Sequence, residues 1–230
     1  MKTIGLLGGM SWESTVTYYQ LINDAVKKEL GGLHSAKIVL YSVEFAEIEE
    51  MQAAGNWDEA ACVLAEAAQA LERAGADFIL ICTNTMHKVA PQVRAAVSVP
   101  LLHIAEATAK ALLEQGIKKV GLLGTKYTMT QEFYRDKLVE AGLDVLTPCE
   151  VDMDIVHDVI YNELCLGEVR EESKAEYMRI IRDLAARGAQ GVILGCTEIG
   201  LLIGQEDSDL PVFDTTKIHA LQAVRAALDA

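Results

Sequence analysis

The sequence predicts an α/β protein with two pseudo-symmetric lobes, each a small doubly wound parallel sheet flanked by helices. Apolar runs of strand length alternate with amphipathic segments of helix length, which is the pattern of βαβ units. Residues 78–85 match residues 191–198, so that Thr83 and Cys196 hold equivalent positions 113 residues apart. Residues 2–9 match residues 118–125 in the same way. Two copies of one αβ unit therefore follow each other along the chain.

The duplication divides the 230 residues into two lobes of roughly 100 residues each, and a segment of that size can bury a core of its own. We assign residues 1–100 together with 208–230 to the N-terminal lobe and residues 101–207 to the C-terminal lobe. If a pseudo-twofold axis relates the lobes, the ends of equivalent strands face each other. The active site is then expected in the cleft between the lobes.

Near-continuous apolar runs are typical of parallel strands covered on both faces. We expect strands at residues 4–7, 37–43, 76–82, 99–104, around 122, and at 144–146, 191–195 and 210–215. We expect helices after Ser11 (apolar positions Val16, Tyr19, Leu21, Ile22 and Ala25), at 58–74 with Asn56 as a cap, near Asn84, and at 129–141, 152–166, 171–186 and 215–230. Residues 44–56 are expected to form a loop or a short helix that lines a site.

Composition excludes several classes of function. With 34 acidic and 20 basic residues the net charge is −14, which disfavours binding to nucleic acid. No apolar run approaches the ~20 residues that a membrane helix needs, and the first residues do not have the shape of a signal peptide. Five cysteines without CxxC or metal-type spacing fit a reducing cytoplasm and indicate no metal site. The turn at Gly8 and Gly9 lacks the spacing of a dinucleotide fingerprint.

Small polar residues stand where the apolar runs end. In open α/β sheets, ligands bind beyond the carboxyl ends of the strands, where the N–H groups of the following helix point outward. We therefore expect Thr83 and Cys196 to approach a common cleft from opposite sides. The residues expected to hold an anionic group of the ligand are Asn84, Thr85, Thr197 and Glu198. The turn at Met10 is expected to line the same cleft, with Gln52 and Cys165 nearer the ligand's side chain.

Cys196 has the clearest chemical potential of the five cysteines. A thiol at a helix N-terminus has a pKa below the ordinary value of about 8.5, so Cys196 is a candidate base or nucleophile near neutrality. The alternative is that a cysteine at a strand end is a small buried hydrophobic residue. Cys82 is expected to point to the other face of its strand, away from Thr83. His87 is either a cleft residue or a packing histidine.

These residues resemble the motifs of the aspartate/glutamate racemase superfamily, the cofactor-independent amino-acid racemases. The resemblance covers essentially the whole chain and is carried by residues 4–10, 83–87 (Cys-Asn-Thr-x-His in the family), 195–198 (Gly-Cys-Thr-Glu) and 211–214. It implies a two-lobed fold, commonly a homodimer, that acts on a small amino acid without pyridoxal phosphate. It also implies a two-base mechanism, in which one cysteine removes the α-proton and the other returns a proton on the opposite face. The cysteine that matches Cys196 serves the L-enantiomer.

The sequence departs from the family pattern in two places. Thr83 stands where the family has its first catalytic cysteine, and a hydroxyl is a far weaker base than a thiol. Residues 44–52 contain no Arg or Lys. Cys165 stands where the resemblance to the aspartate racemases implies a lysine. A carboxylate in the substrate's side chain then has fewer basic residues to pair with. Amino acids with neutral or varied side chains are therefore favoured as substrates.

Two other kinds of protein fit the same residues. One is a decarboxylase or a cis–trans isomerase of the superfamily that works with a single cysteine at the position of Cys196. The other is an amino-acid-binding protein with weak or no catalysis, which lost its activity together with the first cysteine. Exchange of the Cα hydrogen in heavy water distinguishes racemisation from both alternatives.

Overall fold

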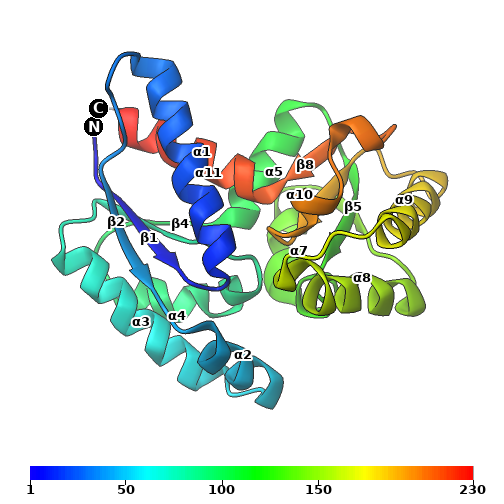
Figure 1. The fold of residues 1–230 in the computed structure, drawn as a ribbon, viewed down its shortest axis with the longest axis horizontal. Coiled ribbons are helices and arrows are strands. Elements are labelled where there is room, and N and C mark those ends of the chain that lie inside the picture. Colours follow the sequence, from blue (N-terminus) through cyan, green and yellow to red (C-terminus); the bar gives the residue numbers. More distant parts are fainter. Residues whose placement is uncertain (230) are drawn as a thin grey trace. The chain divides into compact units, whose positions relative to one another are not determined.

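The chain forms two compact units in the computed structural model, which describes residues 1–229. One unit comprises Met1–Ile104 and Thr216–Ala230, and the other comprises Ala105–Thr215. Each unit contains one four-stranded sheet, with strand orders β2-β1-β3-β4 and β6-β5-β7-β8 (Figure 1). All strand pairs in both sheets are parallel. The α/β class with two equivalent parallel sheets, predicted from the duplication, is confirmed.

The elements of the first unit follow the βαβ alternation. Its strands are β1 (Ile4–Gly8), β2 (Ile38–Ser42), β3 (Phe78–Ile81) and β4 (Leu101–Leu102). Its helices are α1 (Trp12–Leu30), α2 (Phe45–Ala54), α3 (Trp57–Arg73), the 3₁₀ turn η1 (Thr85–Val89), α4 (Ala90–Ala95) and most of α11 (Thr215–Leu228).

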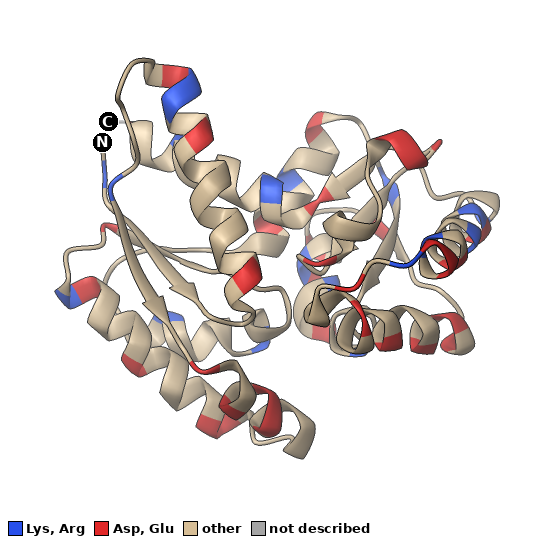
Figure 2. Ribbon diagram, in the orientation of Figure 1, with Lys and Arg blue, Asp and Glu red and all other residues tan. Residues whose placement is uncertain are grey.

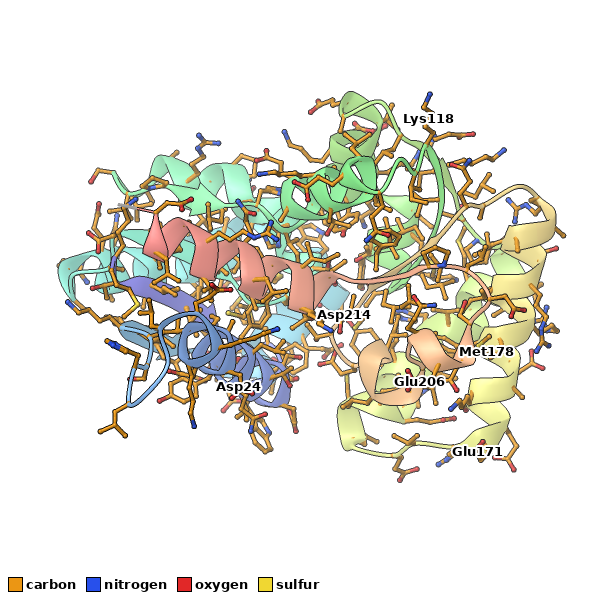
Figure 3. All side chains as sticks on the ribbon, turned by 90° about the horizontal axis from the view of Figure 1, so that it is seen from above. Asp24, Lys118, Glu171, Met178, Glu206 and Asp214 are labelled. Carbon is orange, nitrogen blue, oxygen red and sulfur yellow. The ribbon has the colours of Figure 1, made fainter. Side chains whose placement is uncertain are left out.

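The second unit repeats the alternation of strands and helices. Its strands are β5 (Lys119–Gly124), β6 (Asp144–Leu146), β7 (Val192–Gly195) and β8 (Val212–Asp214). Its helices are α5 (Ile104–Glu114), α6 (Lys126–Thr130), α7 (Glu132–Glu140), α8 (Glu150–Asn162), η2 (Leu164–Leu166), α9 (Glu171–Ala186), α10 (Ile199–Leu202) and η3 (Gln205–Asp207). Figure 3 labels Glu171 and Met178 on α9.

Apolar side chains cover both faces of the first sheet, as its continuous hydrophobic strands require. Ile79 and Ile81 of β3 point into a cluster with the apolar sides of α3 and α4. Phe78 and Leu80 point into a second cluster, which α1 and α11 close from the opposite face. The closing helix therefore packs on the first sheet, as predicted. Ala230, the last residue of the predicted helix, lies outside the described residues.

The second sheet is also buried on both faces. Leu123 of β5 and Val192 and Leu194 of β7 join the apolar sides of α8 and α9 in one cluster. Leu122 and Ile193, which alternate with these residues along the strands, have no exposed surface either. Parallel strands that are inaccessible on both faces explain why these runs contain almost no polar residue.

The boundaries between the units differ from the predicted ones by a few residues. The structure places residues 101–104 with the first unit, because β4 pairs with β3. Residues 208–215 belong to the second unit, whereas the sequence analysis placed them in the N-terminal lobe. The reason is that β8 pairs with β7 and completes the second sheet.

Several helices differ from their predicted form. The helix predicted at 129–141 is two helices, α6 and α7, separated by Gln131 in an extended conformation. The helix predicted at 152–166 ends at Asn162, and a 3₁₀ turn continues it. Asn56 makes no side-chain hydrogen bond to the start of α3. Among residues 1–229, no helix is long and apolar enough to cross a membrane.

Candidate active site

Thr83 follows β3 directly, at the carboxyl end of the first sheet. The strand ends at Ile81, and Thr83 is half-buried in the bend that leads to η1. Its carbonyl oxygen accepts a hydrogen bond from Nδ1 of His87 at 2.8 Å. Nε2 of His87 then accepts the N–H of Ile104 at 3.2 Å. His87 is thus a neutral, buried histidine that holds the backbone of the Thr83 bend, which is the packing role considered from the sequence.

Two further histidines lie beside His87. Its ring centroid is 4.5 Å from that of His103 and 5.9 Å from that of His219. His219 donates from Nε2 to the carbonyl of Leu102 at 2.9 Å and accepts the hydroxyl of Tyr18 at Nδ1, at 2.8 Å. Burial lowers the pKa of His87 well below its ordinary value and that of His219 to about 3. No sequence pattern predicted that His87, His103 and His219 form one cluster, because they are far apart in the chain.

Cys82 confirms the alternation expected along β3. Its side chain is fully buried among the residues that α1 and α11 cover, on the face opposite to Ile81. Burial raises the pKa of its thiol far above the ordinary range. Cys82 therefore cannot replace the missing cysteine at position 83.

Met10, Gln52, Asn84 and Thr85 are all buried in the first unit. Nε2 of Gln52 donates to the sulfur of Met86 at 3.0 Å, which ties α2 to η1. Met10 and Met86 belong to the same apolar cluster. The structure therefore gathers the predicted residues of the first unit around the start of η1.

The turn before α1 is fixed by its glycine and its cap. Gly9 has φ +91°, and a Cβ added there would lie 2.3 Å from the carbonyl oxygen of Val43. The hydroxyl of Thr15 accepts the N–H of Gly9 at 2.8 Å and donates to the carbonyl of Ser11 at 2.9 Å. The side chain of Ser11 caps the helix by accepting the N–H of Ser14, as predicted.

Cys196 occupies the corresponding position in the second unit. It follows β7 directly, and β7 holds the same place in its sheet as β3 does in the first. The half-buried thiol donates to Oε2 of Glu198 at 2.9 Å. The hydroxyl of Thr197 donates to the same oxygen at 2.6 Å. One buried carboxylate thus accepts hydrogen bonds from both side chains that precede it.

The expected low pKa of Cys196 is wrong for this conformation. Burial raises the pKa of the thiol well above its ordinary value, and the nearby charge of Glu198 raises it further. The helix that follows, α10, has only four residues, so the dipole that was expected to lower the pKa is small. Cys196 is therefore a thiol hydrogen-bonded to a carboxylate, not a free thiolate.

Cys165 and Tyr177 lie close to Cys196. Cys165 and Cys196 pack against the same apolar cluster, to which Tyr177 belongs. Burial raises the pKa of Tyr177, and the neighbouring Cys196, Glu163 and Cys165 raise it further. The Tyr177 hydroxyl donates to the carbonyl of Val156 at 2.9 Å. Tyr177 was not predicted from the sequence, because its place in the regular apolar pattern of α9 gives no sign of the nearby thiols.

Asp214 is the last residue of β8, so it adds a further carboxylate at the carboxyl ends of the strands in the second sheet (Figure 3). A Cβ built on Gly200 would lie 3.3 Å from its Oδ2, so the carboxylate lies against α10. Within residues 1–229 there is no group of three or more His, Cys, Asp or Glu side chains placed to hold a metal ion. The chemistry available at this edge is proton transfer between thiol, hydroxyl and carboxylate groups.

The second unit also has an open surface cavity of about 520 Å³ between α5 and α7. Its lining combines apolar and charged residues: Glu106, Ala109, Lys110, Leu113, Glu114, Lys137 and Ala141. None of the predicted site residues lines this cavity, so it is not part of the candidate active site.

Comparison with known proteins gives one consistent result. The sequence model of the Asp/Glu/Hydantoin racemase family matches residues 7–223. The crystal structure of a candidate Asp/Glu racemase from Yersinia pestis is 56% identical, covers 100% of both chains and superposes with a TM-score of 0.94. An aspartate racemase homologue from Pyrococcus horikoshii OT3 is 37% identical over 99% of both chains, with a TM-score of 0.87. The broad specificity amino-acid racemase RacX of Bacillus subtilis (strain 168) is 24% identical over 98% of both chains.

Proposed function

Because the chain belongs to the Asp/Glu/Hydantoin racemase family, we propose that it racemises small amino acids at Cα by transferring protons between Cys196 on one face and Thr83 on the other. The observation that carries this proposal is the Cys196–Glu198 pair, with 2.9 Å between sulfur and oxygen, at the end of the strand equivalent to the one that Thr83 follows. We propose that the reaction proceeds without pyridoxal phosphate, as the resemblance to the cofactor-independent racemases implies.

Glu198 gives Cys196 a route to act as a base despite its raised pKa. As the thiol sulfur takes the α-proton from an L-amino acid, its own proton passes to Oε2 of Glu198, with which it already shares a hydrogen bond. In the reverse direction the thiol donates its proton to the planar carbanion and recovers one from Glu198. Glu198 is therefore assigned to proton transfer rather than to substrate binding.

We assign to Thr83 the proton transfer on the face of the substrate's Cα that lies opposite to Cys196. A hydroxyl is too weak an acid to be ionised near neutrality, but it can pass its proton to a carbanion that has already formed while its oxygen takes a proton from solvent water. The bend that carries it is held through the His87 bond to the Thr83 carbonyl, which leaves the hydroxyl for this role.

The remaining predicted residues are assigned to the substrate. The N–H groups of Asn84, Thr85 and Thr197, at the ends of β3 and β7, are proposed to bind the α-carboxylate. Met10, Gln52 and Cys165 are proposed to contact the side chain. None of these three is basic, and Gln52 is already bonded to Met86, which favours uncharged side chains and a broad substrate range. We further propose that the enzyme works as a cytoplasmic homodimer in D-amino-acid metabolism, with the active site between its lobes; its free cysteines fit a reducing compartment.

The test is a panel of L- and D-amino acids incubated in heavy water, analysed for Cα deuterium and by chiral chromatography. Inversion accompanied by deuterium uptake, abolished for L-substrates by Cys196→Ala, is the expected result. Thr83→Ala should retain some exchange from L-substrates but little inversion. Binding without exchange would instead indicate an amino-acid-binding protein, and no exchange together with loss of carboxylate from malonate-type acids would indicate a decarboxylase. Wild-type inversion by Cys196→Ala would contradict the mechanism.

A further inference from the structure

His103 follows β4 in the same way as Thr83 follows β3. β4 ends at Leu102 and pairs in parallel with β3, with Leu102 opposite Leu80. The carboxyl ends of the two strands therefore meet at one edge of the first sheet, where neighbouring strands lie about 4.8 Å apart. His103 is half-buried at this edge, so water reaches its ring.

The internal repeat gives His103 a counterpart in the second unit. Residues 99–104 (Val-Pro-Leu-Leu-His-Ile) match residues 210–215 (Leu-Pro-Val-Phe-Asp-Thr), so that His103 corresponds to Asp214. The Asp214 carboxylate lies against α10, which begins directly after Glu198. Each unit therefore has an ionisable side chain at the end of its fourth strand, beside the strand whose end carries a residue assigned to proton transfer.

His87 links His103 to the Thr83 bend. The ring centroids of His103 and His87 are 4.5 Å apart, with 60° between the ring planes. Nδ1 of His87 donates to the carbonyl oxygen of Thr83 at 2.8 Å, and Nε2 accepts the N–H of Ile104, the residue after His103, at 3.2 Å. His87 therefore holds the Thr83 bend and the end of β4 next to each other.

The segments that carry these residues contain no carboxylate or amine that could move a proton. Residues 78–87 and 95–105 include no Asp, Glu, Lys or Arg, and the strands of this sheet are also uncharged, as Figure 2 shows for β1 and β2. Cys82 points to the other face of β3. Both ring nitrogens of His87 and of His219 are already hydrogen-bonded, and both rings are fully buried. Of the three histidines, only His103 has a ring that is exposed to water.

We infer that His103 is the proton carrier for Thr83 and exchanges protons with its hydroxyl through one water molecule. When Thr83 gives its proton to the carbanion, the imidazolium of His103 passes a proton through this water to the hydroxyl oxygen and recovers one from solvent. In the reverse direction, the neutral imidazole takes the hydroxyl proton while the oxygen removes the α-proton from a D-amino acid. The inference rests on the proposed function and adds to it the group that lets a hydroxyl act as a base.

The two strand ends then work by the same principle. Each group that is proposed to reach Cα has an ionisable partner, Glu198 for Cys196 and His103 for Thr83. A hydroxyl is a far weaker base than a thiol, so Thr83 depends on its partner more strongly. His103 acts through Thr83 and does not touch the substrate.

Replacement of His103 by Ala in the full chain tests the inference. Cα exchange of L-substrates, which depends on Cys196 and Glu198, should stay near the wild-type rate, whereas inversion should fall by about 10²–10⁴-fold, the usual contribution of general acid–base catalysis. Added imidazole should restore part of the inversion in a saturable manner, and a histidine that only packs would not give this rescue. His34→Ala, which removes an exposed histidine, is the matched control and should invert at the wild-type rate.

A double-mutant cycle distinguishes one proton pathway from two. In a Thr83→Ala background the hydroxyl is absent, so His103→Ala should lower the residual inversion no further. Losses that multiply would overturn the inference, and so would wild-type inversion by a folded His103→Ala, or an equal fall of exchange and inversion without imidazole rescue. His103→Gln, which is larger than Ala but carries no proton near neutrality, gives the same tests apart from the rescue if circular dichroism shows that His103→Ala is unfolded.

The same assays separate this inference from the proposed function. A wild type that racemises amino acids by a route independent of His103 contradicts only the inference. A wild type that exchanges the Cα hydrogen of no amino acid contradicts the proposed function, and the inference with it.

Discussion

Replacing Glu198 by Gln removes the carboxylate that accepts the Cys196 hydrogen bond and that we propose takes its proton, and it keeps the shape of the side chain. Two effects oppose each other. Loss of a general base lowers the rate by about 10²–10⁴-fold. Loss of the negative charge and of its hydrogen bond lowers the pKa of the thiol, since both hold it above the ordinary value, and each unit restores about tenfold in thiolate at a given pH.

At neutral pH the loss of the base should prevail, because burial, the largest cause of the raised pKa, persists in the variant. We expect Cα exchange of L-substrates to fall by at least about tenfold, with an alkaline limb of the rate profile that moves to lower pH. The assay is deuterium uptake over a pH series, together with ultraviolet titration of the thiolate. Glu206→Gln, an exposed carboxylate of the same unit labelled in Figure 3, is the matched control. Wild-type exchange and an unchanged thiol titration in Glu198→Gln would refute the assigned role.

Three other variants test the fold and the site. Thr83→Cys should raise the racemisation rate measured by chiral chromatography, and a lower rate would show that a thiol is not activated there. The folded-state pKa of His219, about 3, lies below its unfolded value near 6.5, so its stabilisation is complete above pH 6.5 and is lost as pH falls toward 3. The free energy of unfolding measured by urea titration should therefore be about 3 kcal/mol lower at about pH 4 than at neutral pH. His219→Gln should reduce this dependence of the unfolding free energy on pH, and the exposed His34→Gln should not. Gly9→Ala should lower the free energy of unfolding by about 3 kcal/mol, and Gly32→Ala, also at positive φ but with open space, by only about 1 kcal/mol.

The features that depend on strand burial could be predicted from the sequence. Strands covered on both faces need continuous apolar runs, so the sheets and the opposite orientation of Cys82 could be inferred without coordinates. The ends of the helices could not be inferred in the same way. The break at Gln131 carries neither Pro nor Gly, and Val16 and Tyr19 on α1, which were expected to face the core, are apolar but point outward. Periodicity identifies an apolar side of a helix and does not say what that side contacts.

For the candidate site, the positions of the residues could be predicted from the sequence, but their chemical state could not. That Thr83 and Cys196 follow equivalent strands was predictable from the repeat, because it depends only on chain order. The pKa of Cys196 was not predictable, because it depends on burial and on the orientation of Glu198, two residues further on. A helix dipole was the expected cause of activation, but a four-residue α10 is too short to supply it. The carboxylate partner became evident only from the side-chain geometry.

The two equivalent strand ends thus differ, and the equilibrium limits how this difference can appear in the proposed reaction. Cys196 is paired with a carboxylate, whereas the Thr83 bend is held by a neutral histidine through its backbone. For the proposed racemisation the equilibrium constant is one, so the ratio of kcat/KM values for the two enantiomers is also one. A stronger base on one face therefore cannot favour one direction overall. It can only change kcat and KM together, or allow Cα exchange without inversion, since a proton removed and returned by Cys196 regenerates the L-substrate. Exchange of L-substrates faster than their inversion is the kinetic signature that this asymmetric pair should leave.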